Sequence, residues 1–485
     1  MLLRVAERLS SLEIPVRMKL KSTLMACLRI VTFAGASSTV GYGQTISAGG
    51  SHTLAICTST EAWAWGSGID GELGNGANNA SYNPAGVNSL TTDIVAVAAG
   101  SSLSLALKSD GTVWAWGYGG LGQLGNGTNG SSNVPVQVTA LSDVRAIACA
   151  GHALALRNDG TVWAWGNNSN GQLGDGTTSS SNVPVQVVSL TDVVAIEAGG
   201  GHSLALKADG TVWAWGWGTY GQLGNGTNSS TSVPVQVSLS ESAVAIAAGQ
   251  IHSFAIVGDG TLRAWGNNDN GRLGTGNIIS SNVPVSVNTL TNVVRISAGF
   301  AHSAAITGDG HLWTWGYNFY GQLGNSSWGS NVPLVNSALT NCTDVQCGTY
   351  YTMVLKNNGT LWGFGDNGAG QIGNGTFNNS YNTPIQTTGL CSISLLAPSE
   401  QLRDKSSLVV APNPTTGLIY VLNGLGIELL DLHVTDATGQ RVNEQPIRIS
   451  AGAVVLDLTS EAPGVYFVTV FNSNHSKVQR VVVQR

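Results

Sequence analysis

Alternating apolar and polar positions dominate the middle of the chain, and residues 193–239 show the pattern most clearly. This stretch contains four short runs, "VVAIEAG", "HSLALK", "TVWAWG" and "VPVQVSL", each bounded by glycine or by polar turn residues. Side chains that alternate with a period of two line the two faces of a β-strand. We therefore predict four short strands in this stretch and an all-β fold, since no window shows the 3.6-residue spacing of an amphipathic helix.

The same unit returns at a nearly constant interval. Its most regular part is a motif that reads W-x-W-G in most copies. The motif ends at Gly66, Gly117, Gly166, Gly216, Gly266 and Gly316, and a weakened version with Trp362 and Phe364 ends at Gly365. Seven copies of a unit of about 50 residues predict a repeat architecture.

Each unit carries a turn signal between its second and third runs. The signal is Asp-Gly in most copies, as at Asp159-Gly160, and Asn358-Gly359 in the last. Both dipeptides tolerate positive φ and favour the primed turns of tight hairpins. Each unit is therefore predicted to be a small antiparallel sheet with a hairpin at its centre.

The faces of the third run explain how such sheets assemble. In "TVWAWG" the tryptophans share one face, and Val and Ala share the other. A sheet of this kind stacks on a copy of itself, and closing the stack into a ring leaves only short edges. The first copy lacks the opening run, and "GLCSISLL" (389–396) extends past the last copy. We predict a seven-bladed β-propeller over residues 44–397, with this extension completing the first sheet.

The ends of the chain differ from the repeat. Residues 398–407 form a predicted linker, and alternating runs in residues 408–485 predict a small β-sandwich. At the amino end, Lys19 and Lys21 precede an apolar stretch over residues 24–36, and small residues precede Gln44. Residues 1–43 are therefore predicted to be an extension plus a signal peptide that starts at Met18, the alternative being a short buried segment. No other stretch is apolar for long enough to span a membrane.

Charge and cysteine content narrow the function classes. Residues 44–398 carry eight Lys and Arg against seventeen Asp and Glu, a net charge of −9. So few cations cannot neutralise many phosphates, which argues against a nucleic-acid partner. Five cysteines follow the predicted signal, none in a C-x-x-C pair, and a Cys342–Cys391 bridge is one pairing that the sequence leaves open.

Two repeated features resemble chemistry but have simpler interpretations. The run "GQLGNG" resembles a phosphate loop, yet a strand rather than a helix is predicted after it, so we interpret its glycines as turn residues. Histidines recur at equivalent positions, and a metal site is the alternative to hydrogen bonding with backbone within or between blades. They are His52, His152, His202, His252 and His302, with Ser102 and Tyr351 standing in the other two copies. We find no catalytic constellation, and predict a protein that is not an enzyme and holds no cofactor or metal.

Variation within the repeat gives the best functional signal. After each W-x-W-G motif comes a loop that is mostly Ser, Asn and Gly, but in copies two, four and six it turns aromatic. Aromatic side chains on polar loops are candidate binding anchors, the alternative being local packing over the blade edge. The candidate binding residues are Tyr118, Trp217, Tyr220, Tyr317, Phe319 and Tyr320.

The pattern "AGxxHSLAL…DGTVWAWGxNxxGQLGxGT…PVQV", present in all seven copies over residues 44–396, resembles the regulator of chromosome condensation family. The resemblance implies a seven-bladed propeller. One alternative function is a guanine nucleotide exchange factor-like regulator by fold analogy, and another is an enzyme with a site at the propeller channel. The main prediction is a secreted or cell-surface propeller that binds an unknown protein or glycan through its loops.

The tail resembles the carboxy-terminal sorting domain of type IX secretion. The resemblance is carried by Pro412-Asn413-Pro414-Thr415 with Gly417, by Asp436 with Gly439, by Pro463-Gly464-Val465-Tyr466 and by a terminal basic-apolar strand. It implies that the type IX machinery recognises residues 408–485 and exports the protein. The alternative is an ordinary sandwich used for binding.

Overall fold

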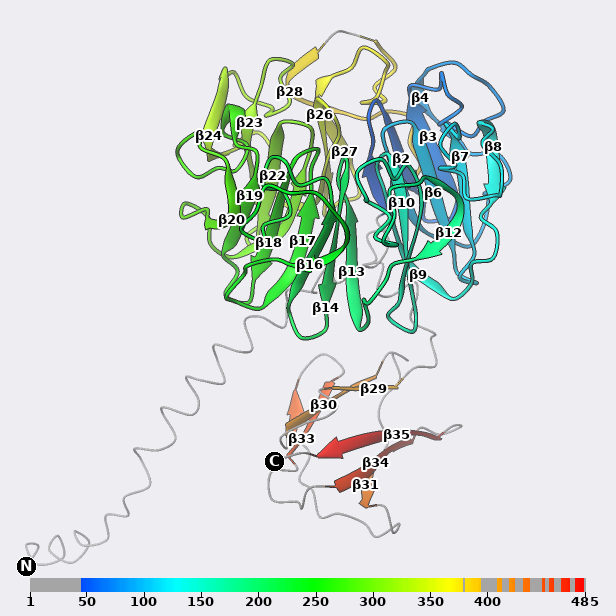
Figure 1. Cartoon of the computed structure of the whole chain (residues 1–485), viewed down its shortest axis with the longest axis vertical. Coiled ribbons are helices and arrows are strands. Elements are labelled where there is room, and N and C mark those ends of the chain that lie inside the picture. Colours follow the sequence, from blue (N-terminus) through cyan, green and yellow to red (C-terminus); the bar gives the residue numbers. More distant parts are fainter. Residues whose placement is uncertain are drawn as a thin grey trace, which may run out of the picture. The chain divides into compact units, whose positions relative to one another are not determined.

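The computed structural model describes residues 45–377 and 380–393 and the backbone of seven strands in the tail. The predicted signal peptide and linker lie outside the described residues. Within the first two ranges the chain forms seven four-stranded antiparallel sheets, each with its strands side by side in chain order. The sheets stand around a common axis as the blades of a propeller (Figure 1). The first strand of each blade contributes residues that line a central channel. The predicted all-β class and the seven blades are confirmed.

The strands are short, as the alternating runs predict. Blades 1 to 4 consist of β1 Ile46–Ala48, β2 His52–Ile56, β3 Ala62–Gly66, β4 Ser81–Gly86; β5 Ile94–Ala99, β6 Leu103–Lys108, β7 Val113–Gly117, β8 Ser132–Gln137; β9 Val144–Cys149, β10 His152–Arg157, β11 Val162–Gly166, β12 Ser181–Gln186; and β13 Val193–Ala198, β14 His202–Lys207, β15 Val212–Gly216, β16 Thr231–Gln236. Blades 5 to 7 consist of β17 Ala243–Ala248, β18 His252–Val257, β19 Leu262–Gly266, β20 Ser281–Ser286; β21 Val293–Ala298, β22 His302–Thr307, β23 Leu312–Tyr317, β24 Gly329–Val335; and β25 Cys342–Cys347, β26 Tyr351–Lys356, β27 Leu361–Asp366, β28 Ser380–Gln386. A single turn of 3-10 helix, η1 Asp269–Gly271, lies in blade 5.

The central hairpins are tight, but their turn type differs from the prediction. In blade 3 the amide of Gly160 donates to the carbonyl of Arg157, and Gly160 has a φ of 80°. Asp159 is not among the residues with positive φ, so the turn is not a primed one. It is an ordinary turn followed by a left-handed glycine, which forms a one-residue bulge. Asp159 instead accepts hydrogen bonds from the amide and hydroxyl of Thr161.

The second tryptophan of each motif joins its blade to the blade before it. Trp215 of blade 4 is fully buried among Leu154, Leu156 and Ala164 of blade 3, and the first tryptophan, Trp213, packs beside the same cluster. The predicted contact between a large ring and a small residue of the neighbouring sheet is present at Ala164, and leucines of the same sheet surround it. The Trp215 indole Nε1 also donates to the carbonyl of Gln172 in blade 3 at 2.8 Å. The same bond is made by Trp65, Trp116, Trp165, Trp265 and Trp315.

The ring closes where the first and last blades meet. The short β1 pairs with β2 from Ala48↔Thr53 to Ile46↔Ala55, and Ile393 then forms an antiparallel bridge with Cys57. Two ends of the chain thus share the inner strand position of blade 1. The prediction that the final segment completes the first sheet is confirmed by the Ile393 bridge, and β1 supplies three further residues of the same strand position. The Trp65 indole donates to the carbonyl of Gln371 in blade 7 and completes the ring.

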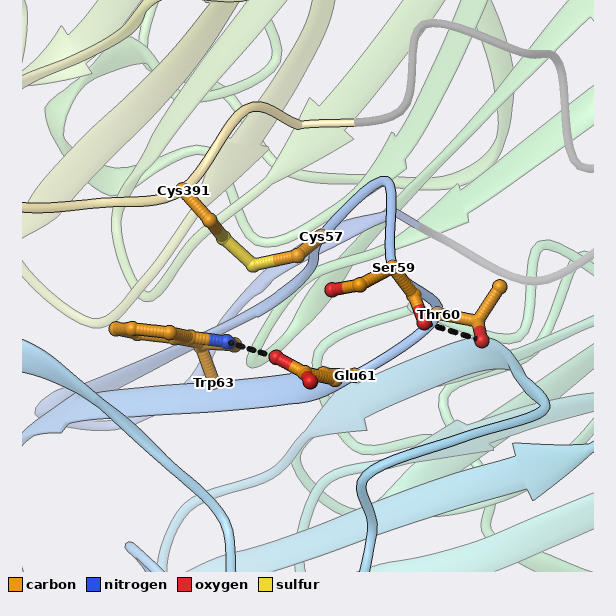
Figure 2. Close-up of a disulfide and its surroundings, with 6 residues drawn as sticks. All are labelled: Cys57, Ser59, Thr60, Glu61, Trp63 and Cys391. Atoms are coloured by element: carbon orange, nitrogen blue, oxygen red, sulfur yellow. Dashed lines mark hydrogen bonds between the residues drawn. A yellow bond between two sulfur atoms is a disulfide. The ribbon is translucent and has the colours of Figure 1, made fainter.

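A disulfide fixes this closure. Cys57 bonds to Cys391, with 5.8 Å between their Cα atoms and a separation of 334 positions along the chain. Figure 2 shows the bond beside the first hairpin, whose turn contains Ser59 and Thr60. The amide of Thr58 also donates to the carbonyl of Ser392 at 2.9 Å. The Cys342–Cys391 pairing considered from sequence is therefore wrong, and Cys342 is a free, buried thiol in blade 7.

The tail is described by its backbone alone. Its strands form a sheet in the order β29-β30-β33-β32 and a second in the order β31-β34-β35. Their bounds are β29 Leu408–Ala411, β30 Leu418–Asn423, β31 Asp431–Asp436, β32 Ile447–Ile449, β33 Ala453–Asp457, β34 Gly464–Phe471 and β35 Ser476–Val483. Side chains that would form the core of the predicted sandwich lie outside the described residues.

Candidate functional site

All six candidate aromatic residues lie on one face of the propeller. The chain crosses this face where it connects the first to the second strand and the third to the fourth strand of each blade, and we call it the loop face. Strand pairing fixes the assignment, because His202 at the start of β14 lies opposite Gly216 at the end of β15. The opposite face carries the Asp-Gly hairpins. The candidates therefore share a surface, although they come from blades 2, 4 and 6.

Blade 6 brings its three candidates into a larger aromatic cluster. The rings of Tyr317 and Phe319 lie 6.3 Å apart, and those of Phe319 and Tyr320 lie 5.2 Å apart. Tyr350, from the β25–β26 loop of blade 7, contacts Tyr320 at 4.8 Å, Tyr317 at 6.3 Å and Phe300 at 5.4 Å. We call these five residues the aromatic cluster. Phe319 is 67% exposed, which is unusual for a phenylalanine that serves packing alone.

The other candidates stand apart from the cluster. In blade 4 the rings of Trp217 and Tyr220 meet edge to face at 5.3 Å. Gly201 lies beneath Trp217, since a Cβ on this glycine would come within 3.3 Å of the indole. Tyr118 in blade 2 is 40% exposed and makes no ring contact with another described residue. The structure thus divides the candidates into a cluster, a pair and a single ring.

An arginine that sequence reasoning missed lies next to the aromatic cluster. Arg272, in the "GRLG" version of the glycine run, is 4% exposed. Its Nη1 donates to the carbonyl of Phe300 at 3.1 Å, and its Nε donates to the carbonyl of Asp269. Burial lowers the pKa of this guanidinium, whereas Asp269 raises it, and it stays charged because the ordinary pKa of arginine is so high.

The repeated histidines belong to a polar network between blades. His202 Nε2 lies 2.9 Å from the Ser253 hydroxyl of the next blade, and that hydroxyl donates to the carbonyl of Gln222. The partner is therefore a side-chain hydroxyl, and not backbone as we predicted. Equivalent pairs are His52–Ser104, His152–Ser203, His252–Ser303 and His302–Thr352.

At the joint between blades 2 and 3, the histidine and its hydroxyl partner are both replaced by apolar residues. The register places Leu103, and not Ser102, at the histidine position of blade 2, which corrects the alignment made from sequence. Ala153 stands at the matching hydroxyl position in blade 3. At the closing seam, the Tyr351 hydroxyl replaces the imidazole and donates to the carbonyl of His52, while Thr53 donates to the Tyr351 hydroxyl. Each joint keeps either a complete polar pair or a complete apolar one.

Burial holds these imidazoles neutral. It lowers the pKa of His52 to about 4 and that of His152 and His302 to about 3, and for His202 the neighbouring His152 adds to the effect. Within the described residues, no group of three or more His, Cys, Asp or Glu could hold a metal ion. The arrangement is a blade-to-blade joint.

The glycine run is confirmed as a set of turn residues. Gly171, Gly174 and Gly176 have φ of 83°, 68° and 87°, a region that suits glycine. A Cβ on Gly174 would lie 2.7 Å from Nε1 of Trp215 in the next blade. Atoms of the next blade therefore lie directly against these glycines. The glycine run forms part of a joint between blades, and we do not interpret it as a phosphate-binding loop.

The central channel is small and lined mainly by glycine and alanine. Its cavity measures about 150 Å³, and Glu197 contributes the single carboxylate among its described lining residues. Burial raises the pKa of this carboxyl to about 8. One buried acid does not supply the paired groups that general acid–base hydrolysis uses.

Variation in the repeat could have identified the missed residues. Phe300 stands two residues before the histidine position, where other copies carry Gly, Ser, Ala, Gln or Thr. Tyr350 stands one residue before it, where other copies carry Ser, Gly, Ile or Ala, and Arg272 replaces a Gln or Glu. Each is a departure from the repeat of the same kind that singled out the other aromatics. Their proximity to Tyr317 and Tyr320 could not be read from sequence, because it depends on how adjacent blades rotate.

Comparison with known proteins agrees with this architecture. The family model of the RCC1-like domain matches residues 25–335 and 180–401. Similar curated proteins include the mitochondrial RCC1 domain-containing protein RUG3 of Arabidopsis thaliana, 38% identical over 106 residues, and the ultraviolet-B receptor UVR8 of the same plant, 35% identical over 108 residues. These matches cover 22% and 21% of the chain, and each covers 24% of the relative. The chain thus spans about a quarter of the length of these curated relatives.

Solved structures show the same fold. Human WBSCR16 aligns with a TM-score of 0.62 and 26% identity, over 67% of this chain and 93% of that one. Prp20p of Saccharomyces cerevisiae, described with its binding to Gsp1p and histones, aligns with a TM-score of 0.64 and 23% identity, over 73% and 89%.

The tail gives a second, independent match. Residues 409–484 match the secretion system C-terminal sorting domain, which indicates export through type IX secretion. No helix among the described residues has the length and apolarity to cross a membrane. The seven blades, their joints and the match over most of the propeller together show that the chain belongs to the RCC1-like domain family.

Proposed function

We propose that this protein is an exported, non-enzymatic binding propeller that captures a protein or a glycan through its loop face. The observation that carries the proposal is the distribution of exposed large apolar side chains. Ten of them lie on loops of this face, namely Ile69, Tyr118, Leu121, Tyr220, Ile278, Ile279, Phe300, Phe319, Trp328 and Phe377. The rest lie on strands, and none lies on a described loop of the opposite face.

Such an asymmetry favours recognition. Apolar side chains gathered on one surface of a water-soluble body mark interaction sites more often than isolated ones do. The aromatic rings present flat, rigid contact area at small entropic cost, which suits either a sugar ring or a protein hot spot. Export through the sorting domain would bring this face to ligands outside the cell.

The other functions considered from sequence receive less support. An exchange factor for a cytosolic GTPase would not meet its partner after export. An enzyme at the channel would have to work with Glu197 as its one carboxylate there.

The test combines capture with stability. The exported full-length protein is immobilised and exposed to surface glycans and to secreted proteins, and bound species are identified. Trp217→Ala, Tyr317→Ala and Phe319→Ala should each weaken capture about tenfold or more, with a melting temperature within about 2 °C of the parent. Val183→Ala, which removes an exposed apolar side chain from strand β12, is the matched control. Unchanged capture together with a lower melting temperature would show that these rings serve packing.

A further inference from the structure

Arg272 breaks a structural rule that the other six blades obey. At this position they carry Glu72, Gln123, Gln172, Gln222, Gln322 and Gln371, and each side-chain oxygen accepts a hydrogen bond from the backbone amide two residues earlier. A guanidinium has no acceptor. Blade 5 accordingly forms η1 at this point, with Asn270 at a φ of 65°. The loop keeps its backbone hydrogen bonds, such as that from the Gly271 amide to the Asn268 carbonyl, but it loses the side-chain bond that the other blades make.

Two backbone carbonyls hold the guanidinium in place, and the nearby Asp269 favours its charge without forming an ion pair with it. Nε and Nη1 donate to the carbonyls of Asp269 and Phe300, while Nη2 has no partner among the described residues and is not among the fully buried unpartnered atoms, so it reaches solvent. No described carboxylate forms an ion pair with Arg272. The carboxylate of Asp269 accepts from the Asn267 amide instead. A cation this buried is costly unless an anion joins it.

Three phenol groups lie around the same place. Phe300, whose carbonyl accepts from Arg272, packs against Tyr350, and Tyr350 packs against Tyr317 and Tyr320. The hydroxyls of these tyrosines make no hydrogen bond with a described residue. Burial raises the pKa of Tyr350, Tyr320 and Tyr317 raise it further, and the charge of Arg272 lowers it.

The surroundings favour a ligand that carries a single negative charge and is otherwise uncharged. Residues 299–301, 318–328, 348–350 and 367–377 of the loop face in blades 6 and 7 contain no charged residue. The one carboxylate beside them is Asp366, at the blade 7 position equivalent to Tyr317, and it accepts hydrogen bonds from the Gly368 amide and the Gln371 side chain. The net charge of −9 over residues 44–398 would repel a polyanion such as nucleic acid. Beside the phenols, the 67% exposed Phe319 offers a ring face on which the apolar side of a sugar can stack.

We propose that Arg272, the hydroxyls of Tyr317, Tyr320 and Tyr350, and the ring of Phe319 form a subsite for the carboxylate-bearing sugar of an acidic glycan, such as a uronic acid. The Arg272 Nη2 pairs with the carboxylate, the phenols donate to its oxygens or to neighbouring hydroxyls, and Phe319 stacks on the ring. This inference rests on the proposed function of the loop face and names its ligand class.

The test uses a variant that the repeat itself supplies. Arg272→Gln installs the residue found in five other blades, so it should fold without loss of stability. Binding of the full-length protein is measured by calorimetry against sialyllactose and against short glycans that carry a single uronic acid, because each of these ligands has one carboxylate. We expect at least one acidic glycan to bind, Arg272→Gln to weaken it by about 10- to 100-fold, and the methyl ester of the same glycan to bind the parent as weakly.

Controls separate the subsite from general charge effects. Arg263→Gln removes the same charge near the opposite face, where Arg263 pairs with Glu241, and should leave glycan affinity unchanged. Equal binding of the acid and its ester, or an unaffected Arg272→Gln, would overturn the subsite. Binding of neutral glycans alone, or of an acidic peptide such as N-acetyl-Gly-Glu alone, would also overturn it while leaving the loop-face function intact. If neither glycan nor protein is captured, the proposed function fails as well.

Discussion

At the residue scale, the repeated histidines show how a feature that resembles chemistry can be structural. Each imidazole is completely buried and meets a hydroxyl on the next blade, and its second ring nitrogen, Nδ1, has no partner among the described residues. Because the Ser253 hydroxyl donates to the Gln222 carbonyl, it accepts from His202 Nε2, which fixes the neutral tautomer. A proton on Nδ1 would introduce a buried, uncompensated charge.

Stability should therefore fall in mild acid. The pKa of His202 is lowered to about 3 in the folded state and is near 6.5 when the chain unfolds, so the unfolded chain binds more protons between these values. The histidine contribution is complete above pH 6.5 and declines below it, by about 1.4 kcal/mol per pH unit for each imidazole. Glu197, whose pKa is raised to about 8, acts in the opposite direction from pH 8 down to its ordinary value.

Replacing one pair by its natural apolar equivalent isolates this effect. His202→Leu with Ser253→Ala copies the Leu103–Ala153 joint. Between pH 7 and pH 5 the double variant should lose about 2 kcal/mol less stability than the parent, measured by urea unfolding at both pH values. Identical pH dependence in the two proteins would mean that His202 does not titrate on unfolding.

At the element scale, one backbone carbonyl of a blade accepts hydrogen bonds from side chains of the next blade. In blade 3 the Gln172 carbonyl accepts from both the Trp215 indole and the Ser203 hydroxyl. In blade 2 the Gln123 carbonyl accepts from Trp165 and from no other described side chain. Phe364 occupies the tryptophan position of blade 7, so a benzene ring is tolerated there. The seven joints are therefore unequal in how much they depend on the indole.

The loss of folding stability on removing an indole N–H should depend on whether the carbonyl that it bonds keeps another donor. Trp215→Phe leaves the Gln172 carbonyl bonded to Ser203, and should cost about 1–2 kcal/mol. Trp165→Phe leaves the Gln123 carbonyl without a described partner, and should cost about 1–2 kcal/mol more. Chemical denaturation of the two variants gives the order directly. Equal losses would show that the shared carbonyl has no special role.

The sequence predicted the elements well because their signals are local. Alternation and the repeat interval identified four strands per blade, and the faces of "TVWAWG" identified the stacking. The hairpin type was wrong because Asp-Gly suits both a primed turn and a turn with a glycine bulge. The partner of His202 and the neighbours of Tyr317 were not predictable, since each depends on contacts between blades whose relative rotation no single repeat encodes. Arg272 was visible as a departure from the repeat, but its role needs Phe300 and Tyr350 beside it.

At the scale of the whole molecule, the propeller depends on its closure. Blade 1 draws its inner strand position from both ends of the described propeller, and Ile393 lies buried with Ile46 and Trp65 at this seam. A bond between Cys57 and Cys391 constrains almost the whole propeller in the unfolded chain. Such a bond also fits the oxidising conditions that an exported protein meets.

Breaking this bond should destabilise the entire ring. Cys391→Ser, or reduction of the parent, should lower the free energy of unfolding by about 2–5 kcal/mol, because the cross-link limits the entropy of the unfolded chain. Thermal unfolding with and without dithiothreitol measures the change. The reductant should have no further effect on Cys391→Ser. An unchanged melting temperature of the parent in reductant would contradict the stabilising role of the Cys57–Cys391 disulfide.

The seam also differs from the five joints that carry a histidine in its response to acid. Tyr351 stands there in place of an imidazole, and burial raises the pKa of its phenol, so this joint gains no charge as pH falls. A circle made from a linear chain has its natural weak point where the two ends meet. In this propeller the Cys57–Cys391 disulfide and a phenol that stays neutral in acid hold that point. Acidification should therefore separate the blades first at a joint that carries a histidine.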